Sequence, residues 1–257
     1  MIEPELWGKS STFLSTVHLK SLTEIKNSIK WKNNESIFEF GMGDGSNSKS
    51  VLFPILPNNY KEFIGSDISR RMVEYLKRNI TDPRATFVIL DMSADTIPEE
   101  FVNRQALKNM YKMLKPEGQM LLTYADETSA DEVYYELSLH SKWKKYDHTK
   151  LISPFFRRKN VMEEYNKLFK EVGFREISST VEQLASKLTD ENMFYDFCIS
   201  INPILSMVSN EEYEEYKQEY VHRMKNNKLN KTKMCPKTGE ISCYTSAVIT
   251  SVLLEKI

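Results

Sequence analysis

The amino-acid sequence predicts an α/β fold built on a mostly parallel, doubly wound sheet. The first apolar segment ends in a turn with glycines at alternate positions, Gly41, Gly43 and Gly45. The second and third apolar segments end in acidic residues, Asp67 and Asp91. A strand that runs through a glycine turn into a helix is the beginning of a nucleotide site, and acids at neighbouring strand ends face the same crevice.

The amino-terminal half alternates helical and extended patterns, as a parallel sheet with crossover helices requires. Ser69 is placed to cap the helix after the second strand, and Pro57 stops the helix after the glycine turn. The strands are expected at residues 36–40, 60–66 and 85–90, and the helices at 5–30, 47–56 and 69–80.

The alternation is interrupted after Asp91, because residues 91–101 contain no apolar segment fit for a strand. In a doubly wound sheet the missing strand would pair with residues 36–40. Leaving about five backbone groups unpaired would cost roughly 5–15 kcal/mol, as much as the stability of a whole domain. Either residues 119–124 move across to pair with 36–40, or the chain is a truncated product of its gene that folds poorly.

The carboxyl-terminal half is expected to contain more helices than strands, and the last two helices lie between two late strands. Helices are expected at 102–114, 129–140, 160–171, 192–201 and 211–224, and strands at 119–124, 175–181 and 242–254. We therefore predict a single domain over residues 1–257. Its Rossmann-like core comprises 1–184 and 236–257, and residues 185–235 form a helical lid inserted before the last strand.

The spacing of the glycines distinguishes between two cofactors. A dinucleotide site needs Gly-x-Gly-x-x-Gly, and the position that requires the last glycine is Ser46. The observed Gly-x-Gly-x-Gly, with Glu39 two residues before Gly41, is the S-adenosylmethionine pattern. Glycines that only form a turn, on an α/β domain that binds no nucleotide, are the alternative.

Each candidate cofactor residue has a chemical role. Glu39 suits the amino group of S-adenosylmethionine, and Asp67 can accept hydrogen bonds from two ribose hydroxyls. Asp91 can accept one from the adenine amino group. Ile68 and Met92 offer apolar surface to both faces of the base.

Beyond the glycine turn, the sequence resembles the juvenile hormone acid methyltransferases of arthropods. The motifs that carry the resemblance span nearly the whole chain: Leu6-Trp-x-Lys-Ser10, Phe40-Gly-Met-Gly-Asp-Gly45, Gly65-Ser-Asp-Ile-Ser69, Leu90-Asp-Met92, Leu114-Lys-Pro-Glu-Gly118, Ile152-Ser-Pro-Phe155, Val172-Gly-Phe174 and Ile201-Asn-Pro203. The resemblance implies a Rossmann-like class I methyltransferase with S-adenosyl-L-methionine as cofactor, bound by Glu39, Gly41, Gly43, Asp67 and Asp91.

Two features depart from that family. Leu14 occupies the position where family members have a glutamine that holds the substrate carboxylate. The family's fourth strand ends in a Leu-His-Trp segment that lines the substrate pocket, and this chain passes directly from Val102 to Asn103 instead. Both departures concern the substrate side of the site rather than the cofactor side.

Composition limits the other functional classes. The chain has 35 basic and 36 acidic residues and a formal net charge of −1, whereas nucleic-acid binders usually carry a basic excess. We expect no signal peptide and no membrane span. Three cysteines fit a reducing, cytoplasmic location, and Cys235 and Cys243 alone do not make a metal site.

Together these observations favour a methyltransferase that esterifies the carboxylate of a small lipophilic acid, by resemblance a farnesoid acid. Such a substrate is already ionised at neutral pH, so no general base is required and no catalytic residue is assigned. A catalytically impaired relative that binds cofactor or lipid is the alternative from another class. The balanced charge disfavours a third possibility, an RNA methyltransferase.

Overall fold

The computed structural model describes residues 19, 22–23, 25–91, 102–188, 191–234 and 241–257. These residues form two compact units, each described here by itself. The glycine-loop unit contains the described residues of His18–Tyr124, Arg158–Val181 and Thr250–Ile257. The helical unit contains those of Ala125–Arg157 and Glu182–Ile249.

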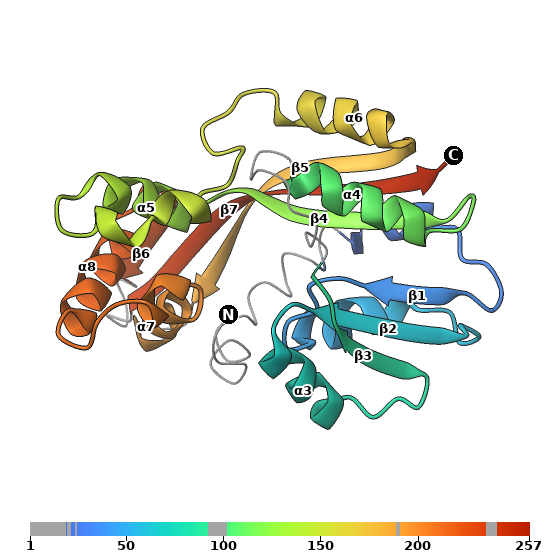
Figure 1. Ribbon diagram of the computed structural model, residues 1–257, viewed down its shortest axis with the longest axis horizontal. Coiled ribbons are helices and arrows are strands. Elements are labelled where there is room, and N and C mark those ends of the chain that lie inside the picture. The colour runs from blue at the N-terminus through green and yellow to red at the C-terminus, as the bar shows by residue number, and fades with distance from the viewer. Residues whose placement is uncertain (1–18, 20–21, 24, 92–101, 189–190, 235–240) are drawn as a thin grey trace. The chain divides into compact units, whose positions relative to one another are not determined.

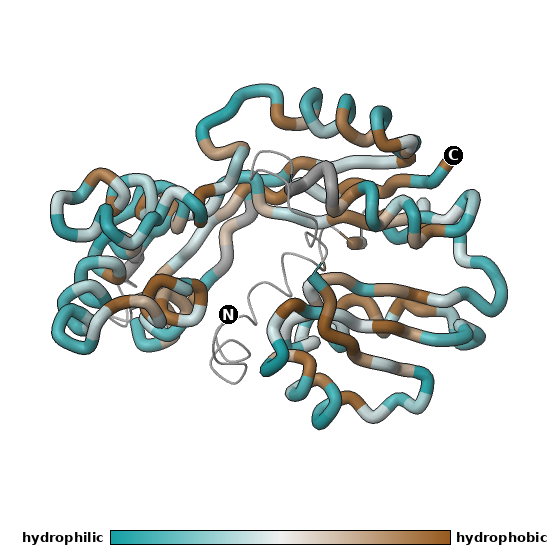
Figure 2. The backbone as a smooth tube through the Cα atoms, viewed as in Figure 1, coloured by the Kyte–Doolittle hydropathy of each residue, from teal (hydrophilic) through white to brown (hydrophobic). Residues whose placement is uncertain are grey.

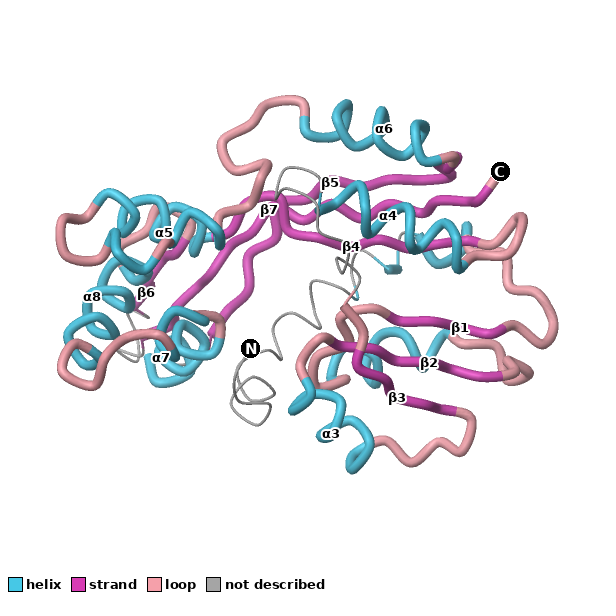
Figure 3. The backbone as a smooth tube through the Cα atoms, viewed as in Figure 1, coloured by secondary structure: helices cyan, strands magenta, loops and turns pink. Residues whose placement is uncertain are grey.

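The glycine-loop unit holds the predicted parallel strands. Strands β1 (Ser36–Glu39), β2 (Glu62–Asp67) and β3 (Ala85–Ile89) form a three-stranded sheet in the order β1-β2-β3 (Figures 1 and 3). Both pairings are parallel. The carboxyl ends of the three strands therefore lie along one edge of the sheet, which confirms the predicted arrangement of this segment.

The two crossover segments of this sheet differ in regularity. Helix α3 (Arg70–Asn79) begins at the predicted cap, where the Ser69 side chain accepts from Met72 N. The segment after the glycine loop is a π-helical turn, η2 (Ser48–Leu52), followed by a 3₁₀ turn, η3 (Phe53–Ile55). The predicted helix is thus irregular, because Pro54 has no N–H with which to continue an α-helical ladder.

Apolar side chains from these elements make the core of the sheet. Figure 2 shows the strands as mostly apolar and the turns between them as hydrophilic. The buried cluster draws on the glycine loop, the strands and one face of α3, and consists of Met42, Tyr60, Phe63, Val73, Leu76, Ile80 and Phe87. The glycine loop therefore contributes to the core as well as to the edge of the sheet.

A second sheet contains the longer strands β4 (Gln119–Thr128), β5 (Phe174–Leu188) and β7 (Ile241–Lys256), in the order β4-β7-β5. The short strand β6 (Asn230–Met234), which was not predicted, pairs with β7 in antiparallel fashion. Strand β7 is central, and Val252, Leu253 and Leu254 are at most 1% exposed.

The prediction that residues 119–124 pair with β1 is wrong, because β4 pairs with β7. In the described part of the chain, β2 is the strand paired with β1. Contacts at the start of β4 explain the choice. Glu117 N donates to Lys256 O at 3.1 Å and Lys256 N donates to Gly118 O at 2.9 Å. Moving β4 to β1 would break these bonds and uncover the apolar central strand β7.

Lys256 also fixes the helix that precedes β4. Its ammonium donates to the carbonyl oxygens of Tyr111 at 2.8 Å and Leu114 at 2.7 Å, at the carboxyl end of α4 (Val102–Met113). A cation at that end of a helix satisfies free carbonyls and opposes the helix dipole. Helix α6 (Val161–Val172) ends at Gly173, whose φ of +108° provides the predicted left-handed cap.

The helical unit packs three helices, α5 (Ser129–Leu139), α7 (Glu191–Ser200) and α8 (Tyr213–Lys225), with 3₁₀ turns at Lys144–Tyr146, His148–Leu151 and Pro203–Ser206. Its core is aromatic, with Trp143, Tyr216 and Tyr220 at most 1% exposed. Phe194 and Phe197 of α7 belong to this core. The function of 185–235 as a lid stays a prediction.

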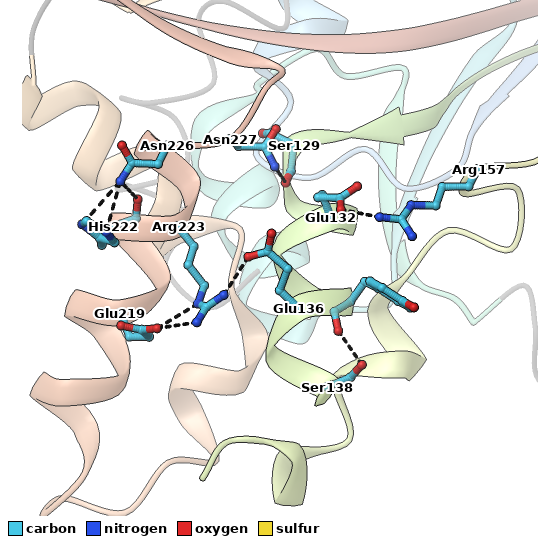
Figure 4. Close-up of polar contacts among 11 residues, drawn as sticks. Ser129, Glu132, Glu136, Ser138, Arg157, Glu219, His222, Arg223, Asn226 and Asn227 are labelled. Carbon is cyan, nitrogen blue, oxygen red and sulfur yellow. Dashed lines mark hydrogen bonds and ion pairs between the residues drawn. The ribbon is translucent and has the colours of Figure 1, made fainter. Parts of the chain in front are cut away.

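Polar contacts join α5 to α8 in the helical unit. The Arg223 guanidinium pairs with Glu136 on α5 and with Glu219 on its own helix, each at 2.7 Å (Figure 4). Asn227 Nδ2 donates to the carbonyl oxygen of Ser129 at 3.2 Å. These contacts line a polar pocket with a volume of about 330 Å³, and its charges are already paired with one another.

No helix in the described ranges combines the length and the apolar character that crossing a bilayer requires. Within the same ranges, no three His, Cys, Asp or Glu side chains are grouped as ligands of a metal ion. Cys198 and Cys243 are buried free thiols. Cys235 lies outside the described residues.

Candidate cofactor site

The candidate site is the loop between β1 and η2, at the carboxyl edge of the three-stranded sheet. Gly41, Gly43 and Gly45 have φ angles of +63°, +59° and +78°. Residues with a Cβ rarely adopt this left-handed region, so the alternate glycines are what allow the chain to turn here. At Gly45 a Cβ would also lie 2.7 Å from Leu76 Cδ2. The packing at this position therefore favours glycine as well as the backbone conformation does.

Hydrogen bonds to β2 hold the loop in place. Met42 N donates to the carbonyl oxygen of Ser66 at 2.9 Å, and Gly43 N donates to Asp67 Oδ2 at 2.9 Å. These two hydrogen bonds attach the loop to the end of the neighbouring strand.

Asp67 has a different immediate role from the predicted one. It is 4% exposed, and its second oxygen, Oδ1, accepts from Ser69 N at 2.8 Å at the start of α3. Asp67 thus ties the glycine loop to the next helix. A carboxylate has about four acceptor positions, so two remain for the ribose hydroxyls that the sequence analysis assigned to it.

Glu39, the last residue of β1, is a half-buried acid whose Oε2 atom is fully shielded from solvent. Its Oε2 has no hydrogen-bond partner among the residues that the structure describes. Desolvation by burial raises the pKa of Glu39 from 4.5 to about 7, and the nearby Ser48 side chain opposes this shift. A buried carboxylate without a partner is costly, and a ligand cation would remove that cost.

The other predicted residues lie at the same edge. Ile68 follows β2 and is 63% exposed, an unusual value for a large apolar side chain. Asp91 follows β3 by two residues and is exposed. Met92 lies outside the described residues. The structure joins Gly43 to Asp67 directly, and it places Glu39, Ile68 and Asp91 at neighbouring strand ends.

Two polar residues of this region were missed by sequence reasoning. Asp44 is 5% exposed, and its carboxylate accepts from both Ser46 N and Ser46 Oγ. Ser48 is 1% exposed, and its hydroxyl has no hydrogen-bond partner within the described ranges. Serines alternate at 46, 48 and 50, and no local signal shows which of them faces the interior.

The residues present fit S-adenosylmethionine better than a dinucleotide. Its methionine part carries an ammonium group, which complements the unpaired oxygen of Glu39. A pyrophosphate would instead meet Asp44 and Glu39, two acids beside the loop where a dinucleotide site needs N–H donors and positive potential.

Comparison with known proteins identifies one clear relative. Over 240 residues the chain is 27% identical to juvenile hormone acid O-methyltransferase of Bombyx mori, covering 86% of this chain and 85% of that protein. This chain resembles the juvenile hormone acid methyltransferases. The resemblance predicted from the motifs is therefore confirmed, and it extends along most of both chains. No protein-family model matches the chain.

A solved structure confirms the fold. The crystal structure of a proposed methyltransferase from Bacillus halodurans C-125 aligns with a TM-score of 0.52 and 17% identity, over 92% of this chain and 99% of that one. The chain therefore has the Rossmann-like class I methyltransferase fold that the resemblance implies. The assignment of cofactor contacts to Glu39, Gly41, Gly43, Asp67, Ile68, Asp91 and Met92 stays a prediction.

Proposed function

We propose that this chain is an S-adenosylmethionine-dependent methyltransferase that converts the carboxylate of a small lipophilic acid into its methyl ester. The observation that carries the proposal is the buried Glu39 Oε2, which lacks a partner beside the glycine loop. The similarity to juvenile hormone acid O-methyltransferase of Bombyx mori supports the reaction and the class of acid.

In this proposal the described residues bind and orient the cofactor. Glu39 accepts from its ammonium group, and the free lone pairs of Asp67 accept from the ribose. The exposed Ile68 side chain covers one face of the adenine, and Asp91 accepts from its amino group. The glycine loop admits the ligand because Gly41 has nothing within 4 Å of the position that a Cβ would take.

The bound cofactor supplies an electrophilic methyl group on a sulfonium. The acid substrate is an anion at neutral pH, so the protein needs to align it and exclude water rather than remove a proton. The reaction therefore needs no general base. Specificity depends instead on how the substrate pocket aligns the acid.

A direct assay tests the proposal. The purified chain is incubated with S-adenosylmethionine and either farnesoic acid or a saturated fatty acid, and methyl esters are detected by mass spectrometry. Ester formation that Glu39→Gln reduces at least tenfold is the expected result. A chain that binds no S-adenosylhomocysteine in calorimetry, and forms no ester from any acid, contradicts the proposal.

One observation favours the alternative, a cofactor-binding relative with impaired catalysis. β1 carries Glu39 at its end, and in the described ranges β2 is its one paired strand, while β4 pairs with β7. The family's fourth-strand segment is missing from the sequence. Tight binding of S-adenosylhomocysteine without ester formation would support this alternative over the enzyme.

A further inference from the structure

The helical turn after the glycine loop carries three serines at alternate positions, and their hydroxyls have different partners. Ser46 Oγ donates to Asp44 Oδ2. Ser50 Oγ donates to the carbonyl oxygen of Ser46 at 2.7 Å. The most deeply buried of the three, Ser48, has no partner for its hydroxyl among the described residues, although it is 1% exposed. Buried hydroxyls are usually paired, so this exception needs an explanation.

Ser48 acts on the same carboxylate that lacks a partner. The Ser48 side chain lies near enough to the Glu39 carboxylate to lower its pKa against the effect of burial, although no hydrogen bond joins the two buried atoms Ser48 Oγ and Glu39 Oε2. Glu39 ends β1 and Ser48 begins η2, and the glycine loop connects the two. Two buried polar atoms without partners therefore come from the two ends of the same loop, on neighbouring side chains.

We propose that Ser48 is a second ligand of the cofactor's ammonium group, beside Glu39; the inference rests on the proposed function. A primary ammonium has three N–H donors. One donates to Glu39 Oε2 and another to a lone pair of Ser48 Oγ, while the serine O–H donates to the Glu39 carboxylate. This arrangement gives both unpartnered atoms their hydrogen bonds at once.

The neighbouring charged groups do not act as hydrogen-bond partners of Glu39 Oε2 or Ser48 Oγ, because they have other partners. The Asp44 carboxylate is occupied by Ser46, and that of Asp67 accepts from Gly43 N and Ser69 N. The Lys49 ammonium donates to the carbonyl oxygen of Asn79 at 3.0 Å. In the described part of the chain, burial and Ser48 account for the shift of Glu39, and no cation contributes to it.

Two ligands separate a contact with the ammonium group from a general effect on the loop. S-adenosylhomocysteine carries the amino-acid moiety, and 5′-methylthioadenosine shares the nucleoside and lacks that moiety. Dissociation constants are measured by calorimetry at pH 8 for the full chain and for Ser48→Ala. We expect Ser48→Ala to weaken S-adenosylhomocysteine about tenfold and to change 5′-methylthioadenosine less than twofold.

Ser50→Ala is the matched control, since it removes a hydroxyl from the same turn that already has a backbone partner; neither affinity should change. Ser48→Cys, which preserves volume with a poor acceptor, replaces Ser48→Ala if the latter melts early. An equal loss of affinity for both ligands, or no loss for S-adenosylhomocysteine, overturns the role proposed for Ser48. Either result leaves the proposed function intact. A wild-type chain that binds neither ligand overturns the proposed function, and this inference with it.

Discussion

Each of the two units of this chain shields an ionisable side chain from water, and the two side chains have different roles. In the glycine-loop unit, Glu39 is half-buried, its buried Oε2 atom has no partner within the described ranges, and desolvation raises its pKa to about 7. In the helical unit, His148 is 0% exposed, and Nε2 lies 3.0 Å from Tyr216 Oη in an aromatic core. Burial lowers the pKa of His148 to about 4, so it stays neutral.

The difference separates a binding site from a core. A neutral imidazole between aromatic rings is stable in a filled interior, because no charge has to leave water. A buried carboxylate without a cation lowers stability until a cationic group binds beside it. The glycine-loop unit thus keeps a carboxylate whose desolvation cost a ligand cation can remove. In the helical unit His148 Nδ1 also has no hydrogen-bond partner among the described residues, but the neutral ring carries no charge that needs a counter-ion.

The largest expected effect tests the rigidity of the site. Gly45→Val should lower the free energy of unfolding by about 3–5 kcal/mol, because it adds both a left-handed φ penalty and an overpacked contact with Leu76. Gly41→Ala is the control, with the same backbone penalty and open space, and should cost about 1–2 kcal/mol. Urea unfolding followed by circular dichroism measures both. Equal costs would mean that Gly45 is not packed against α3.

The two buried groups predict opposite dependences of stability on pH. The folded-state pKa of Glu39 is raised, so its carboxylate costs stability progressively as pH rises from 4.5 to about 7. The folded-state pKa of His148 is lowered, so its contribution is complete above 6.5 and is lost as pH falls toward about 4. Each effect amounts to about 3 kcal/mol.

Glu39→Gln exposes the contribution of His148. Wild-type stability should be nearly flat between pH 4.5 and 6.5, because the two slopes oppose one another. The variant should instead gain about 3 kcal/mol over that range, and be more stable than wild type at pH 8. Urea titrations at a series of pH values provide the measurement. A wild-type curve as steep as that of the variant would mean that the pKa of Glu39 is not raised.

A smaller effect tests how completely the helical core is satisfied. Tyr216 Oη lies 3.0 Å from His148 Nε2 and accepts from Asn202 Nδ2 at 3.4 Å. Tyr216→Phe should cost about 1–3 kcal/mol, because two buried partners lose a hydrogen bond. Tyr146→Phe removes a hydroxyl that bonds to Glu212 at the surface, and should cost under about 1 kcal/mol. Similar thermal shifts for both variants would contradict this assignment.

The smallest expected effect concerns the polar link between α5 and α8. Arg223→Met removes the pairs with Glu136 and Glu219 and should cost about 0.2–1 kcal/mol, since the guanidinium is partly solvated. The same variant should leave the affinity for S-adenosylhomocysteine unchanged. A large loss of stability that disappears in 1 M salt would show that this network contributes more than surface pairs usually do.

The glycine-loop unit was the more predictable of the two. Its strands, the cap at Ser69 and the glycine turn are local patterns of alternation, capping and backbone geometry. Of the predicted site residues, Asp67 lies at a strand end as expected, and its two oxygens also accept from Gly43 N and Ser69 N. Sequence spacing places a side chain at an edge and does not reveal its internal partners.

Pairing over long separations could not be predicted from local patterns. β4 stays with β7 because of contacts such as those of Lys256 with Glu117 and Gly118, which lie far away along the chain. β6 reads as a polar segment, Asn-Lys-Thr-Lys-Met, and is a strand because β7 offers it an edge. The buried hydroxyl of Ser48 likewise depends on a π-helical turn, which the local pattern did not predict.

The double attachment of Asp67 has a consequence for the kinetics of binding. Its two oxygens accept from Gly43 N and Ser69 N, so internal hydrogen bonds fix the glycine loop and the start of α3 to the end of β2. A preformed entrance has little ordering entropy left to lose and needs no slow rearrangement. Stopped-flow traces should therefore show a single phase whose rate rises linearly with ligand concentration. Differences in affinity among variants of the loop should then appear in the time that the ligand stays bound.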